Sequence, residues 1–128
     1  MRDILVIDDD PIYGQLVLQR LELTSFSSTL HLGPFGTMSA IRQLQPRLVI
    51  LDVTMPGLDG TRISEMIRKT RSLSDIRVMF HSSLSQRELD PLVLAHGADA
   101  GLHKSASRGE FTALVQEMMR TARRRTQP

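Results

Sequence analysis

The chain has no cysteine among its 128 residues. That absence excludes disulfides, thiolate nucleophiles and cysteine-based zinc sites, and it fits a reducing compartment, so we expect a cytoplasmic protein. Long apolar runs are also missing: none approaches the length of a membrane span, and the first is interrupted by acids too early for a signal peptide. The sequence therefore gives no reason to expect a membrane partner.

Aromatic residues are scarce, with no tryptophan, one tyrosine and four phenylalanines, so the core must be mainly aliphatic. A strong excess of one charge is missing too, because 16 basic and 14 acidic side chains leave a net charge of +2. Much of this excess lies in the last residues, so direct nucleic-acid binding is not expected. We expect one globular domain at residues 1–122, followed by a basic tail or the start of a linker at residues 123–128.

The most informative stretch is LVILDVTMPGLDG, at Leu48–Gly60. It opens with four apolar residues, the pattern of a short parallel strand that is covered on both faces. The strand ends at Asp52, and a loop containing proline and glycine follows. Ligands of open α/β sheets bind beyond the carboxyl ends of the strands, so this acid marks a candidate site.

Short apolar runs alternate with segments of helical periodicity along the whole chain. Strands are expected at Ile4–Ile7, Thr29–Leu32, Leu48–Leu51, Ile76–His81 and Asp99–His103. Helices are expected from Pro11 to about Leu23 with Asp10 as N-cap, from Gly36-Thr37 to before Pro46, from near Thr61, after Ser83, and through Phe111 to Ala122. This alternation predicts a parallel, doubly wound sheet with helices on both faces.

The fourth helix has two candidate starts. Ser85 and Glu88 have the spacing of a capping box. Pro91 would then lie inside the helix, where proline is unfavourable. The alternative start uses Asp90 as the cap and Pro91 as the first helical residue.

Polar residues that follow the strands form one candidate constellation: Asp8, Asp9, Asp52, Ser82 and Lys104. Three carboxylates at one edge repel one another unless a cation joins them, and an all-oxygen ligand set favours Mg²⁺. Asp52 would then be a nucleophile toward phosphorus, giving an aspartyl phosphate. Lys104 would supply charge and Ser82 a hydroxyl for the phosphoryl oxygens, so that phosphorylation would act as a switch.

Each of these residues has an ordinary explanation when taken alone, as a helix cap, a solvated turn or a surface lysine. Their joint placement at four of the five strand ends favours a functional site. The histidines lie apart in the sequence and lack the spacing of a metal site, so we interpret them as structural. They are His31, His81, His96 and His103.

Four motifs resemble the receiver domain of two-component response regulators, and the likeness covers nearly the whole chain. They are ILVIDDDP, LVILDVTMPGLDG, VMFHSS and GADAGLHKS. The first resembles the strand with the acidic pair, the second the phosphoacceptor strand and loop, and the others the segments with the switch hydroxyl and the lysine. The resemblance implies a flavodoxin-like (βα)5 fold with strand order 2-1-3-4-5.

The resemblance also implies the site's chemistry. Asp52 would take a phosphoryl group from a phosphohistidine on a sensor histidine kinase or phosphotransfer protein. Asp9, Asp52 and the backbone carbonyl of Thr54 would bind Mg²⁺ directly, and Asp8 mainly through water. The protein would be a signalling domain rather than an enzyme, beyond self-catalysed phosphoryl transfer and autodephosphorylation. It would act on a downstream protein or a covalently linked output domain, and a dimer through the fourth and fifth helices would be compatible with the family.

Three positions depart from the family pattern. Gly101 stands where the family usually has a switch aromatic. Ser105 stands where it has a proline after the lysine, so a cis Lys-Pro bond is excluded. Pro91 is expected to interrupt the fourth helix. We therefore hypothesise that rearrangement of Ser82 is not coupled to an aromatic side chain at position 101.

Two alternatives remain open from the sequence. A receiver-like interaction module that no longer relies on phosphorylation would fit the altered positions. A haloacid-dehalogenase-type phosphatase would use Asp8 as nucleophile and Asp10 as general acid. The phosphatase reading leaves Asp52 and the MPGLDG loop unexplained and lacks a late acidic pair for the metal.

Overall fold

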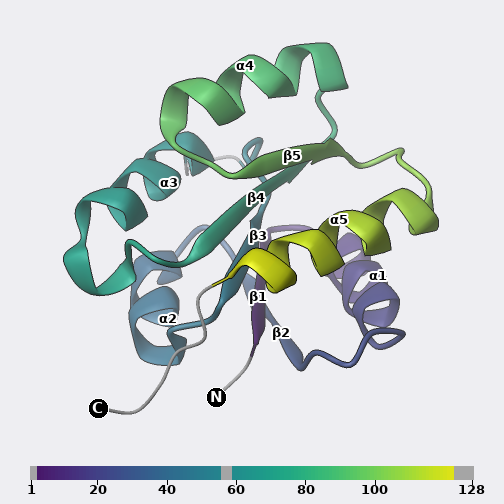
Figure 1. Cartoon of the computed structure of the whole chain (residues 1–128), viewed down its shortest axis with the longest axis horizontal. Helices are drawn as coiled ribbons and strands as arrows, with labels where there is room; N and C mark the ends of the chain where they lie inside the picture. Colours follow the sequence, from purple (N-terminus) through teal and green to yellow (C-terminus); the bar gives the residue numbers. More distant parts are fainter. Residues whose placement is uncertain (1–2, 56–58, 123–128) are drawn as a thin grey trace.

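The computed structural model describes residues 3–55 and 59–122, in which five parallel strands form one sheet of order β2-β1-β3-β4-β5 (Figure 1). The strands are β1 (Ile4–Asp8), β2 (Ser28–Leu32), β3 (Leu48–Leu51), β4 (Arg77–Ser82) and β5 (Ala100–His103). The helices are α1 (Pro11–Leu21), α2 (Thr37–Leu44), α3 (Gly60–Lys69), α4 (Gln86–His96) and α5 (Arg108–Thr121), with a 3-10 turn, η1, at Arg71–Leu73. The doubly wound, flavodoxin-like arrangement and its strand order are thus confirmed.

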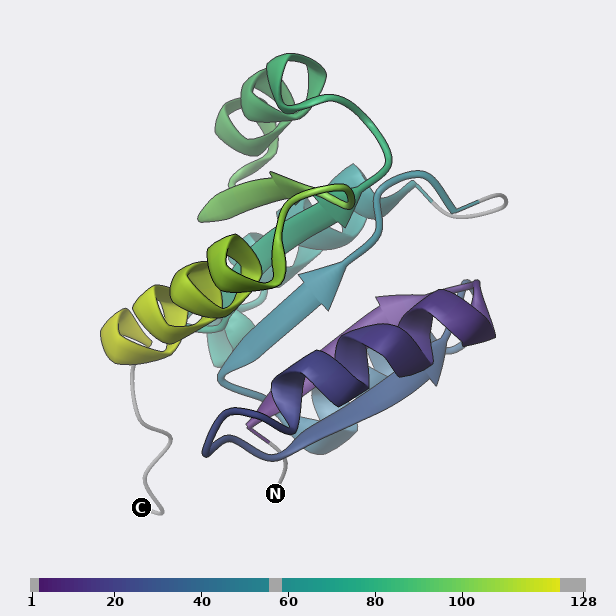
Figure 2. The same cartoon turned by 90° about the vertical axis from the view of Figure 1, so that its right-hand side faces the viewer.

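Helices cover both faces of the sheet. One layer contains α1 and α5, which lie in front of the sheet in Figure 2, and the other contains α2, α3 and α4. Alternate residues of β1 enter the two cores, because successive side chains of a strand point to opposite faces: Ile4 and Val6 pack with α1 and α5, and Leu5 and Ile7 pack with α2 and α3. The two strands with weak sequence signals, β2 and β5, are the edges of the sheet and are only partly buried.

The start of α1 is fixed as the sequence predicts. The side chain of Asp10 accepts hydrogen bonds from the backbone N–H groups of Ile12 and Tyr13, and Pro11 occupies the first helical position. Gly14 also has a packing reason, because a Cβ there would lie 2.8 Å from the Leu30 side chain on β2. This close approach brings the first turn of α1 onto the sheet beside the carboxyl end of β1.

The start of α4 uses the capping box. Ser85 Oγ accepts from Glu88 N–H, and a Glu88 carboxylate oxygen accepts from Ser85 N–H. The helix then continues through Pro91 to His96, so the start at Asp90 is wrong and the expected interruption does not occur. Pro91 and Arg87 are both exposed, and water can bind the Arg87 carbonyl that loses its helical partner.

Several boundaries differ from expectation by one or two residues. The α1 helix ends at Leu21 rather than near Leu23, and Ala122 lies beyond α5 as its C-cap, in an extended conformation. Strand β4 includes Ser82, and β5 begins at Ala100 rather than at Asp99. Because Ser82 belongs to β4 and pairs with His103 of β5, the sheet fixes its backbone.

Candidate functional site

The carboxyl ends of four strands bring together residues that are far apart in the sequence. Asp8 is the last residue of β1, Asp52 follows β3, Ser82 ends β4 and Lys104 follows β5. Backbone hydrogen bonds align these ends: Asp52 N–H donates to Ile7 O at 3.1 Å, and Lys104 N–H donates to Ser82 O at 2.7 Å. The parallel register therefore places the four side chains at one edge, as the sequence predicts.

Lys104 joins the two buried carboxylates. Its Nζ donates to Asp8 Oδ2 at 2.9 Å and to Asp52 Oδ2 at 3.1 Å. Asp8 and Asp52 are only 3% and 5% exposed. Burial by itself lowers the pKa of Lys104, but the hydrogen bonds and charges of the two aspartates outweigh this effect and hold the pKa above its ordinary value. The lysine is therefore a fixed positive charge beside Asp52.

The second oxygen of each aspartate is held by its own turn. Asp52 Oδ1 accepts from the N–H of Thr54 at 2.9 Å and from its hydroxyl at 2.7 Å. Asp8 Oδ1 accepts from Asp10 N–H at 3.0 Å. These contacts fix the orientation of both carboxylates, so that their Oδ2 atoms face Lys104 and the space between the strands.

Three carboxylates form a ligand set for a hard cation. Asp8, Asp9 and Asp52 each offer one carboxylate oxygen, and these atoms all lie within 4.8 Å of one another. Asp9 is exposed and the other two are buried, so the cluster is open on one side. Because every donor is an oxygen, the residues fit a metal such as Mg²⁺ or Ca²⁺ rather than a thiophilic one. Thr54 contributes its N–H and hydroxyl to Asp52, whereas a ligand role for its carbonyl stays a prediction.

Ser82 lies at the same end of the sheet, as the last residue of β4. It is fully buried, and its Oγ accepts from Leu84 N–H at 3.2 Å. Within residues 3–55 and 59–122, no hydrogen bond joins the Ser82 hydroxyl to the side chain of Asp52 or Lys104; the backbone carbonyl of Ser82 accepts from Lys104 N–H. Because Oγ only accepts in its contact with Leu84, the hydroxyl proton is still available for another acceptor.

Two residues of the site were not recognised in the sequence as part of it. The Tyr13 hydroxyl, from α1, lies 3.2 Å from both the Lys104 carbonyl oxygen and His81 Nε2. The Lys104 ammonium lies 4.2 Å from the centre of the Tyr13 ring, a cation–π distance. His81 was interpreted only as structural. Their positions in the sequence could have indicated a place near the site, because Tyr13 is in the first helical turn after the acidic residues and His81 directly precedes Ser82.

His81 is held neutral inside the protein. Burial lowers its pKa from 6.5 to about 4. Its Nδ1 lies 2.9 Å from Leu102 O, which only accepts, so Nδ1 carries the proton. In the neutral ring Nε2 is then an acceptor, and it shares the single Tyr13 hydroxyl proton with the Lys104 carbonyl oxygen, each at 3.2 Å.

A family model described as the response regulator receiver domain matches residues 4–116. This chain belongs to that family. Receivers are signalling phosphoacceptors rather than classical enzymes, and the cluster of Asp8, Asp9, Asp52 and Lys104 is a typical phosphoacceptor site. Membership excludes the phosphatase alternative, and the geometry agrees, because the carboxylate of Asp10 caps α1.

The receiver is similar to longer regulators. It is 33% identical to the transcriptional regulatory protein BaeR of Escherichia coli O6:H1 over 118 residues, which cover 91% of the chain and 48% of BaeR. It is 31% identical over 120 residues to the DNA-binding dual master transcriptional regulator RpaA of Synechocystis, covering 94% of the chain and 50% of RpaA. The chain thus spans about half the length of these relatives.

Solved structures share the fold. The receiver domain of Francisella response regulator 1452 superposes with a TM-score of 0.84 at 24% identity, covering 96% of this chain and all of that one. None of the helices within the described ranges is long and apolar enough to cross a membrane.

The departures of this receiver from the family pattern have a structural basis. A Cβ at Gly101 would lie 2.7 Å from Val93 Cγ2 and 3.0 Å from Leu89 Cγ, so α4 packs directly on β5 where an aromatic side chain would stand. Ser105 is exposed, and its hydroxyl lies 2.6 Å from His103 Nδ1. The missing aromatic is therefore a matter of space and not of backbone conformation.

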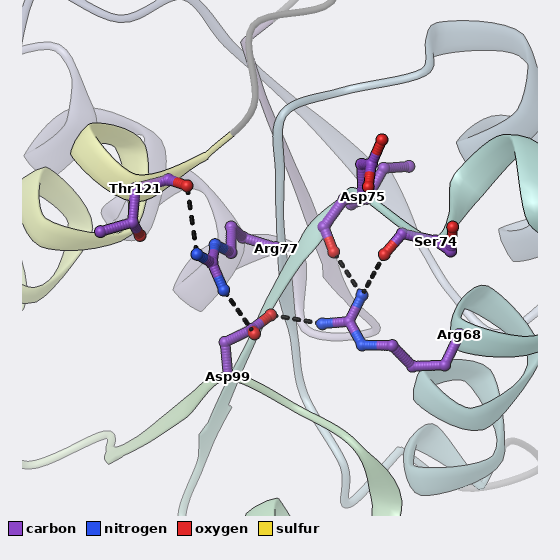
Figure 3. A pocket seen from close by; sticks show the side chains of 7 residues that line it. Arg68, Ser74, Asp75, Arg77, Asp99 and Thr121 are labelled. Atoms are coloured by element: carbon purple, nitrogen blue, oxygen red, sulfur yellow. Dashed lines mark hydrogen bonds and ion pairs between the residues drawn. The ribbon is translucent and has the colours of Figure 1, made fainter.

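A second polar cluster lies at the amino-terminal ends of β4 and β5, around a hollow of about 260 Å³ (Figure 3). Arg68 and Arg77 both donate to the carboxylate of Asp99. Arg68 also donates to Ile76 O, and Arg77 to Thr121 O. The donors named here already have protein acceptors, so the cluster fastens α3, β4 and α5 together and is structural.

Proposed function

We propose that Asp52 takes a phosphoryl group from a phosphohistidine on a sensor histidine kinase or a phosphotransfer protein. An Asp52 carboxylate oxygen forms the new bond to phosphorus, the P–N bond to the histidine breaks, and the imidazole keeps that electron pair and takes up a proton. The observation that carries this proposal is the buried Asp52 carboxylate with the Lys104 ammonium at 3.1 Å. The ammonium is placed to bind a phosphoryl oxygen.

Mg²⁺ is the cation proposed for the acidic cluster. Asp9, Asp52 and the Thr54 carbonyl would be its direct ligands, with Asp8 mainly acting through water. Bound there, the cation supplies positive charge that offsets the carboxylates and the phosphoryl oxygens. The all-oxygen cluster supports this assignment, because Mg²⁺ typically combines a few carboxylates with water and a substrate phosphate.

The proposed output is a change in a protein-interaction surface. A phosphoryl group on Asp52 offers new acceptor oxygens, and the Ser82 hydroxyl turns from Leu84 toward them, moving the β4–α4 loop. The target is a downstream protein or a covalently linked output domain in the cytoplasm. The greater length of the two transcriptional regulators supports a linked domain beyond the receiver at residues 1–122, reached through the basic segment 123–128.

Intact mass after incubation with Mg²⁺ and acetyl phosphate tests the phosphoryl acceptor. We expect one added phosphoryl group on the wild type and none on Asp52→Ala. Asp90→Asn, on the exposed face of α4, is the matched control and should still be modified. Modification of Asp52→Ala to the same extent would refute Asp52 as the acceptor. A folded wild type that takes up no phosphoryl group and binds no beryllofluoride would favour the phosphorylation-independent interaction module.

A further inference from the structure

Tyr13 contacts Lys104 at two groups, the side-chain ammonium and the backbone carbonyl. Its ring lies 4.2 Å from the ammonium, and its hydroxyl lies 3.2 Å from the lysine's carbonyl oxygen. The ammonium is also the group that binds Asp8 and Asp52. Because the lysine side chain has several rotatable bonds, these contacts restrict where its charge can lie. Tyr13 is half-buried on the first turn of α1, which Asp10 caps, so the tyrosine itself is well fixed.

His81, on β4, contacts Tyr13 through its Nε2 atom and through its ring. The single Tyr13 hydroxyl proton is shared between two acceptors at 3.2 Å, Lys104 O and His81 Nε2, and His81 Nδ1 donates to Leu102 O, two residues before Lys104. The His81 ring packs against Phe111 of α5, with 5.2 Å between ring centres. One chain of contacts therefore leads from the Lys104 ammonium through Tyr13 and His81 to the α1–α5 face.

On the α4 face, the position of the switch aromatic is occupied by Gly101. At Gly101 there is no side chain, and Leu89 and Val93 of α4 occupy the space. At this position, β5 therefore has no aromatic side chain on the α4 face that could respond to phosphorylation. The Tyr13–His81 pair lies on the other side of the sheet, beside the same lysine.

We propose that Tyr13, held by His81, is a positioning residue for Lys104, and that this pair on the α1–α5 face takes the place of the aromatic switch missing at position 101. This inference rests on phosphorylation of Asp52 as proposed above. Toward oxygens added to Asp52 the ammonium can direct its third N–H or one of the two that now bind the carboxylates, and we infer that it shifts toward these oxygens. It then moves relative to the Tyr13 ring, and the environment of the tyrosine changes.

Tyrosine fluorescence tests this movement directly, because the chain has one tyrosine and no tryptophan. The wild-type receiver is first saturated with Mg²⁺ and then titrated with beryllofluoride, which stands in for the phosphoryl group. We expect a saturable change in tyrosine emission in the second step. Its midpoint should equal the binding constant measured by calorimetry, and Asp52→Ala should show neither binding nor the change.

Substitution at Tyr13 tests positioning. Tyr13→Leu removes ring and hydroxyl and should weaken beryllofluoride binding about threefold to tenfold, the effect of losing a cation–π contact. Tyr13→Phe keeps the ring and should retain most of the affinity. Ile12→Ala, on the neighbouring residue that is 83% exposed, is the matched control and should bind as the wild type does. Thermal unfolding of each variant checks that the fold is intact.

The outcomes separate the two proposals. If wild-type receiver does not bind beryllofluoride, the phosphoacceptor function fails. If it binds but tyrosine emission stays constant, or if folded Tyr13→Leu binds as tightly as wild type, the role of Tyr13 is refuted and the phosphoacceptor function stands. A role of Tyr13 in packing alone would lower the melting temperature of Tyr13→Leu without changing its affinity.

Discussion

The side chain of Val93 fills the space that a side chain at Gly101 would need, with Cγ2 2.7 Å from the position of a Cβ. Leu89, one turn earlier on α4, closes the same space at 3.0 Å. The glycine is therefore a packing requirement of the α4–β5 contact.

Gly101→Ala should destabilise the receiver. The added methyl group overpacks the contact with Val93, and such insertions into packed regions cost about 1–3 kcal/mol. Urea unfolding followed by circular dichroism measures the loss. Val93→Ala in the same chain should recover part of it, because the two substitutions share one contact and are not additive.

Gly109→Ala is the matched control for that experiment. The nearest side-chain atom to its Cβ would be Ser107 Oγ at 3.9 Å, which is ordinary contact in the first turn of α5. We expect no destabilisation, and a gain of up to about 1 kcal/mol from the better helix propensity of alanine. Equal stability of Gly101→Ala and wild type would show that α4 is not fixed against β5 as described.

The stability of the receiver should fall between pH 6.5 and about 4 through His81. Burial holds the pKa of this histidine at about 4 in the folded protein, against 6.5 for an unperturbed one. In that interval the unfolded chain binds a proton that the folded one does not, so lowering the pH favours unfolding, and above pH 6.5 the contribution is fully present. The total from this residue is at most about 3 kcal/mol.

Unfolding free energies of wild type and His81→Phe across this interval test the assignment. The phenylalanine keeps the packing against Phe111 but cannot take up a proton. Because the carboxylates titrate similarly in both proteins, the difference between the two curves isolates His81, and it should shrink or reverse as the pH falls. Parallel curves from pH 7 to pH 4 would contradict a buried neutral histidine.

Asp10→Ala should reduce stability and leave phosphorylation intact. The carboxylate caps α1 by accepting from Ile12 N–H and Tyr13 N–H, and loss of such a cap costs about 1 kcal/mol. Asp10→Ser should restore most of the stability because serine also caps helices. Phosphoryl uptake from acetyl phosphate is measured alongside by intact mass. Loss of uptake in a folded Asp10→Ala receiver would mean that Asp10 belongs to the reaction site.

Much of the fold follows from local features of the sequence. The apolar runs before Asp8 and Asp52 read as buried strands because they lack polar alternation, and both are fully buried. Asp10 with Pro11 marks the start of α1 for reasons that lie within one turn. The edge strands β2 and β5 were harder to recognise, because partial burial requires fewer apolar residues.

Pro91 shows where local rules were insufficient. A proline inside a helix removes one hydrogen bond, and the sequence alone left two starts for α4 open. The capping box at Ser85 and the burial of Leu89 against the α2–α3 side of the sheet stabilise the longer helix. A local capping box and the tertiary packing of Leu89 thus together outweighed the unfavourable effect of Pro91, and the sequence alone did not show how much Leu89 would be buried.

The amino-acid sequence by itself determined which residues stand at the ends of β1, β3 and β4, because each of these strands is a local apolar run that stops at polar residues. It thereby determined the aspartates and Lys104 as one candidate site. Only the tertiary structure decided what surrounds that site. The contact of Tyr13 with His81 spans 68 residues and that with Lys104 spans 91. Such contacts depend on how α1 packs across the sheet, which no local pattern specifies.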